Sequence, residues 1–82
     1  MDNEILIRSN IAALLAAPKV KSKTREIAGE WKLLNDEIPY YHGTPKNVEF
    51  TVILVNGDCC IKVAAKINRD TAKLSNIVVE DI

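Results

Sequence analysis

The sequence predicts a small α+β domain in which an N-terminal helix packs on an antiparallel β-meander of three to four strands. Three observations lead to this fold class. Residues 2–16 repeat apolar side chains at helical spacing, residues 48–67 alternate apolar and polar residues around an Asn-Gly pair, and residues 73–80 alternate again. A chain of 82 residues is long enough for one domain, which we expect to span residues 1–82.

The first element is expected to be a helix from Asp2 to Ala16. Its apolar positions fall at i, i+4, i+7 and i+8, so they form one stripe along the helix. Asp2 or Asn3 can serve as the N-cap. The helix is expected to end before Pro18, because proline disfavours the helical conformation of its predecessor. The stripe consists of Ile7, Ile11, Leu14 and Leu15.

The segment between this helix and the Asn-Gly pair gives weaker signals. Lys19–Lys23 is expected to be a short basic connector, and Asn35–Asn47, with two prolines and a glycine, is expected to be a loop. Thr24–Leu34 alternates with a period of two, which predicts a strand. A helix is the alternative there, because the apolar residues also fit helical spacing, although Gly29 disfavours a helix by about 1 kcal/mol.

The hairpin is the clearest feature of the chain. Val48–Val55 and Cys59–Ile67 are the expected strands, and Asn56-Gly57 predicts a type I′ turn between them. A last strand is expected over Lys73–Glu80, with a β-bulge near Asn76. The resulting order of elements is α-β-β-β-β. The residues expected to face the core are Cys59, Ile61, Val63, Ala65 and Ile67 in one strand and Leu74, Ile77 and Val79 in the other.

The composition argues against several classes of function. The chain has 11 basic and 11 acidic residues, whereas a dedicated nucleic-acid binder usually has a basic excess. Aromatic residues make up 5% of the chain, which is too few for a base-stacking surface. No apolar run reaches the roughly 18 residues that a bilayer-spanning helix needs. We therefore predict neither a nucleic-acid partner nor a membrane span, while the sequence itself indicates no compartment.

The two cysteines do not predict a reactive or metal-binding pair. Neighbours on a strand point to opposite faces, so Cys59 and Cys60 cannot jointly bind one metal or easily form a disulfide. Zinc usually takes four ligands, and the chain has a single histidine. Cys59 is expected to pack as a small apolar residue, while the role of Cys60 stays open. We predict no catalytic residue, no cofactor and no metal.

Basic side chains form the candidate site, and they predict a non-enzymatic protein-interaction domain. A basic run precedes the predicted meander, and two lysines line the outer face of the second hairpin strand. Such groups attract an acidic protein partner over a long range. The alternative is a solvated surface, because lysines commonly protect exposed strands from aggregation. The predicted partner-binding residues are Lys19, Lys21, Lys23, Arg25, Lys62 and Lys66.

Two other functions stay open at this point. A small-ligand-binding or enzyme domain would have a cavity between helix and sheet, with His42, Tyr40 or Tyr41 at its mouth and the Asn35–Asn47 segment as its gate. A structural subunit would instead complete a homodimer through its helix or its unpaired edge strand.

The order of elements also resembles a known family. The segments that carry the resemblance are L-L-A-A-P-K-V, I-A-G-E-W, V-E-F-T-V-I-L-V-N-G-D, C-C-I-K-V-A-A-K-I and K-L-S-N-I-V-V-E-D-I. They are similar to the soluble domain shared by the cytochrome c oxidase assembly factor 1 family and the related 21-kDa subunit of the mitochondrial presequence translocase. The resemblance implies a non-enzymatic binding domain in the mitochondrial intermembrane space, contacting translocase or respiratory-chain proteins. Ala16 departs from the family, which has a glycine there, and no site residue carries over.

Overall fold

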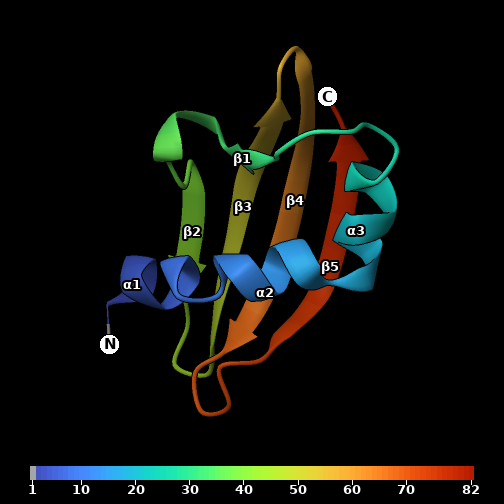
Figure 1. The fold of residues 1–82 in the computed structure, drawn as a ribbon. Helices are drawn as coiled ribbons and strands as arrows, with labels where there is room; N and C mark the ends of the chain where they lie inside the picture. The colour runs from blue at the N-terminus through green and yellow to red at the C-terminus, as the bar shows by residue number, and fades with distance from the viewer. Residues whose placement is uncertain (1) are drawn as a thin grey trace.

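The α+β fold class is confirmed by the computed structural model, which describes residues 2–82. Three short helices lie across one face of an antiparallel sheet (Figure 1). The predicted domain also includes Met1, which lies outside the described residues. The helices are α1 (Asn3–Arg8), α2 (Ile11–Ala16) and α3 (Pro18–Thr24); the strands are β1 (Lys32–Leu33), β2 (Tyr40–Gly43), β3 (Asn47–Asn56), β4 (Cys59–Asn68) and β5 (Leu74–Asp81), and the 3₁₀ turn η1 (Leu34–Asp36) follows β1.

The long β3–β4 hairpin forms the centre of the sheet. The strand order is β1-β3-β4-β5, and β2 also pairs with β3. The two short strands share one edge, because β2 pairs with the start of β3 and β1 with its end. The five strands exceed the predicted three to four because Tyr40–Gly43, which we expected to lie in a loop, pairs residue by residue with Val48–Thr51.

The predicted N-terminal helix is divided into α1 and α2 by two polar residues. The Ser9 hydroxyl and the Asn10 side-chain amide each donate to the Leu6 carbonyl oxygen, at 2.9 Å in both cases. Such bonds give the backbone an alternative to continued helix. The apolar stripe nevertheless faces the sheet as predicted: Ile7 and Leu14 are buried, and Ile11 and Leu15 pack against the core.

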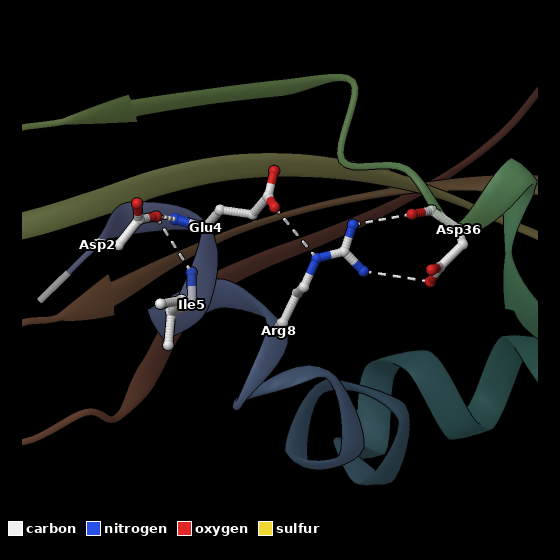
Figure 2. A network of polar contacts seen from close by, with 5 residues as sticks. All are labelled: Asp2, Glu4, Ile5, Arg8 and Asp36. Atoms are coloured by element: carbon white, nitrogen blue, oxygen red, sulfur yellow. Dashed lines mark hydrogen bonds and ion pairs between the residues drawn. The ribbon is translucent and has the colours of Figure 1, made fainter.

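A polar network holds α1 against the turn after β1 (Figure 2). Asp2 is the N-cap, and its carboxylate accepts hydrogen bonds from the backbone N–H groups of Glu4 and Ile5 at 2.8 and 3.4 Å. Arg8 pairs with Glu4 at 3.5 Å. Its guanidinium also donates to the carbonyl oxygen and the carboxylate of Asp36, at 2.8 and 3.2 Å. The network thus joins segments that lie 28 residues apart.

The predicted basic connector is wrong, because Lys19–Lys23 lies within α3. Pro18 is the first helical residue, where its missing N–H is not needed and its fixed φ suits a helix. Val20 is the one buried residue of this helix. A single apolar anchor gives no stripe, so the pattern could not predict a helix.

The predicted strand over Thr24–Leu34 is also wrong for most of its length, since only Lys32–Leu33 pairs with β3. Ahead of Lys32, the chain makes a turn at Gly29. Its φ is +123°, and an added Cβ would lie 2.9 Å from the Asn56 side chain. The alternating pattern came partly from Trp31, whose indole N–H caps α3 by donating to the Thr24 carbonyl oxygen at 3.1 Å.

The hairpin strands are confirmed, but the type I′ turn over Asn56-Gly57 is wrong. Asn56 pairs with Cys59, so Gly57 and Asp58 are the central residues. Only Gly57 has a positive φ, of 61°, which fits a type II′ turn. Cys59, beside this turn, is a half-buried free thiol, as is Cys60. The remaining inward-facing residues are buried as predicted, and the core consists of Leu6, Ile7, Leu14, Val20, Val48, Phe50, Val52, Leu54, Ile61, Val63, Ala65 and Ile67.

Two isoleucines in α1 provide a matched test of this packing. Ile7 is fully buried, whereas the side chain of Ile5 is 60% exposed. We expect Ile7→Ala to lower the free energy of unfolding by about 3 kcal/mol, because it leaves a cavity between helix and sheet. Ile5→Ala should change it by less than about 0.5 kcal/mol. Urea denaturation of both variants measures the difference, and equal losses would contradict the placement of α1.

Candidate functional site

An open groove between α3 and β5 is the candidate site. It has a volume of about 660 Å³. The helix runs alongside the strand at the margin of the sheet (Figure 1). The lining combines apolar strand residues with charged helix residues, so it has the mixed character of a binding surface. The lining residues are Pro18, Lys19, Ser22, Lys23 and Glu26 from the helical side and Ile77, Val78, Val79 and Asp81 from β5.

The β5 strand is an edge of the sheet. Among residues 2–82 it pairs with β4 alone. Alternate residues of such a strand direct their N–H and C=O groups away from the sheet, where another strand can bind them. The groove therefore lies beside unpaired backbone, and a ligand placed there would meet both hydrogen-bonding groups and side chains.

A β-bulge in β5 determines which residues face the groove. Ser75 pairs with Lys66 and Val78 with Ala64, so Asn76 and Ile77 together lie opposite a single residue of β4. The bulge predicted near Asn76 is thus confirmed, and Asn76 has a φ of 52°. The extra residue shifts the alternation by one position. As a result, the three predicted inward-facing residues of β5, which lie on both sides of Asn76, all pack against the core. They are Leu74, Ile77 and Val79.

The charges along the groove are unevenly distributed. At one end, the Lys19 ammonium donates to the Ile77 carbonyl oxygen at 3.2 Å and forms no ion pair within residues 2–82. At the other end, Lys23 pairs with Asp81 at 2.9 Å and with Glu26 at 3.8 Å. The hydrogen bond that Lys23 donates to the Asp81 carboxylate raises the pKa of Lys23 above its ordinary value. One end is therefore cationic, while the other holds two carboxylates and one ammonium.

The structure separates the six predicted partner-binding residues. Lys19 and Lys23 line the groove, and Lys21 and Arg25 are exposed elsewhere around α3. The other two, Lys62 and Lys66, alternate with buried residues of β4 and so lie on the opposite face of the sheet. Each faces a carboxylate on a neighbouring strand: Lys62 lies 3.3 Å from Glu80, and Lys66 lies 3.8 Å from Glu49.

Sequence reasoning missed the groove because it assigned α3 to a connector. Ser22, Glu26 and Asp81 line the groove but were not predicted site residues. A signal was present in the sequence, since Lys19, Lys23 and Glu26 have the i, i+4 and i+7 spacing of one helix face. That spacing carries information only once Pro18 is known to begin a helix.

The surroundings of His42 differ from those expected of a ligand pocket. His42 is exposed in β2 and pairs in register with Glu49. Tyr40 borders a hollow of about 220 Å³ on the outer face of the sheet, but His42 does not line it. Within residues 2–82, no three or more His, Cys, Asp and Glu side chains gather as a metal site would require.

Comparisons of the chain with protein-family models, with curated proteins and with solved structures found no match. None of the helices that residues 2–82 form has the length and apolar character needed to cross a membrane. The geometry of the groove is therefore the basis on which a function can be inferred.

Asn76 allows a test of the bulge that forms the site. A left-handed backbone suits glycine and is tolerated by asparagine, but it is costly for a β-branched residue. We expect Asn76→Val to lower the free energy of unfolding by about 1–2 kcal/mol and Asn76→Gly to change it by less than about 0.5 kcal/mol. Thermal or urea unfolding gives both values. Equal stability of the Val and Gly variants would mean that residue 76 does not adopt this conformation.

Proposed function

We propose that this chain is a non-enzymatic protein-interaction domain that binds an extended segment of a protein partner by strand addition to β5. The observation that carries this proposal is the combination of an open edge strand with an adjoining groove along α3. In strand addition, backbone hydrogen bonds supply much of the affinity, and pockets for alternate side chains supply specificity. The groove offers both kinds of contact.

The regular part of the edge determines the length of the partner segment. Pairing with β4 is regular from Val78 to Asp81, and Ile77, the second residue of the bulge, adds its carbonyl oxygen to the free edge, so Ile77–Asp81 is the stretch available to a new strand. Five residues of antiparallel strand span about 17 Å. Because the Ile77 carbonyl oxygen is accessible to Lys19, Val79 and Asp81 are expected to direct their backbone groups to the same side.

The charge of the groove determines the polarity of the partner segment. Lys19 holds its ammonium on the Ile77 carbonyl oxygen, which is otherwise an unpaired edge acceptor. An incoming backbone N–H would take over that oxygen and release the ammonium. A carboxylate on the incoming segment, placed opposite Ile77, would then pair with Lys19. The preferred segment therefore carries β-branched or other apolar residues and an acidic residue at one end.

The lysines on the outer face contribute less to this proposal. Lys62 and Lys66 already have carboxylate neighbours at 3.3 and 3.8 Å, so an acidic partner would have to compete with Glu80 and Glu49. Exposed ion pairs of this kind contribute only about 0–1 kcal/mol each. We therefore assign the recognition of charge chiefly to Lys19, which has no such neighbour within residues 2–82.

The resemblance to the assembly-factor and translocase family adds a proposal about the cellular compartment. A domain of that kind would meet its partner in the mitochondrial intermembrane space, among respiratory-chain or translocase proteins. The groove supports the binding role alone, and the compartment and the partner's identity stay predictions.

Short peptides test the proposed function directly. We expect a blocked peptide of alternating Val and Thr that ends in Asp to bind several-fold more tightly than the same peptide ending in Lys, by about 1 kcal/mol for an exposed pair. Nuclear magnetic resonance titration should shift the amides of Ile77, Val79 and Asp81. Shifts confined to the outer face of the sheet, or no shifts with either peptide, would contradict strand addition at β5.

Variants of α3 provide the matched control for this titration. Lys19→Glu should reverse the preference, so that the Lys-ended peptide binds better, because the charge opposite the peptide end is inverted. Lys21→Glu makes the same change on the same helix outside the groove and should leave the preference as it is. Equal effects of the two substitutions would show that general charge, rather than the Lys19 contact, selects the peptide.

A further inference from the structure

One strand that could occupy the edge and the groove belongs to the protein itself, namely β5 of a second copy of this chain. We infer that two copies associate through antiparallel β5–β5 pairing, with a two-fold axis passing beside Val79. This inference rests on the proposed function, because it uses the same edge and the same groove and names their occupant. It follows from the backbone register and from the charges at the two ends of the groove.

The backbone of β5 determines the register of the pairing. The residues expected to direct their N–H and C=O groups outward are Ile77, Val79 and Asp81. In an antiparallel pair, residues of this kind lie opposite one another and exchange both hydrogen bonds. A register centred on Val79 achieves this for all three residues: Val79 faces Val79 of the second copy, and Ile77 faces Asp81 of the second copy. The pairing uses Ile77, the last residue of the bulge, and the four residues that follow it.

The same register also brings opposite charges of the two copies together. Asp81 of the second copy would lie opposite Ile77, whose carbonyl oxygen is where the Lys19 ammonium now rests, at 3.2 Å. The two-fold axis repeats the contact, so the dimer contains two Lys19–Asp81 pairs. Each Asp81 would then lie between Lys23 of its own chain, now 2.9 Å away, and Lys19 of the other.

The polarity of the groove favours this antiparallel arrangement over a parallel one. The Lys19 end carries one positive charge, and the other end carries Lys23 against Glu26 and Asp81, a net charge of −1. A two-fold rotation brings opposite ends together, which makes the surface self-complementary. A parallel arrangement would place like charges side by side. In this register Val78, which is 49% exposed, lies opposite Glu80 of the second copy and diagonal to its own symmetry mate on the outer face.

Two charge-reversed variants test the inference through their mixture. Sedimentation velocity of the wild-type chain over a wide concentration range should show a monomer–dimer equilibrium. Lys19→Glu and Asp81→Lys should each weaken the dimer at least about tenfold, because each places like charges at both contacts. An equimolar mixture should form a heterodimer, since each of its two contacts again joins an acid to a base. Lys32→Glu, on β1 at the opposite edge, should leave the dimer unchanged.

Each outcome separates the inference from the proposed function. A wild-type chain that stays monomeric at all concentrations overturns the dimer, while peptide binding at β5 would still support the proposed function. A dimer that neither variant weakens, or a mixture that fails to restore association, also overturns it, because the copies would then meet through another surface. The mixture also addresses folding, since two misfolded variants would not restore each other.

Discussion

The register of the β3–β4 hairpin is the constraint on which the rest of the molecule depends. Ten consecutive residue pairs join Asn47–Asn56 to Cys59–Asn68 without interruption. Because side chains alternate between the faces of a strand, a slip by one residue would expose the core face of the moving strand. The helices, the short edge strands and β5 all attach to the surface or the edges that this register creates.

The groove at β5 follows from two features added to the hairpin. The bulge at Asn76 keeps Ile77 and Val79 on the core face, and the buried Val20 holds α3 beside that strand. Lys19 then covers an edge carbonyl oxygen that would otherwise be free to pair. Bulges and lysines are common means of protecting edges from uncontrolled association. Here the protecting lysine is held by one hydrogen bond, so a strand with the right charge can displace it.

The sequence predicted the parts of this structure that are carried by regular burial. The hairpin strands, the last strand and the bulge near Asn76 were predicted because their apolar residues alternate in a way that only a half-buried sheet explains. The sequence did not predict α3, whose single buried residue produces no periodic pattern, or β2, whose exposed side chains produce none either. Lys19 and Lys23 were predicted as site residues from charge alone, whereas Asp81 was not.

Charge counted over the whole chain says little about how this surface would recognise a partner. The 11 basic and 11 acidic residues cancel, and three of the six predicted site residues pair with carboxylates on neighbouring segments. The feature that can recognise a partner is the difference in charge between the two ends of the groove, cationic at Lys19 and net acidic at Asp81. Such a difference selects the direction of an incoming strand more than it selects the sign of a partner's net charge. A neutral chain is therefore a suitable partner for this groove, provided that its strand enters with the acidic end at Lys19.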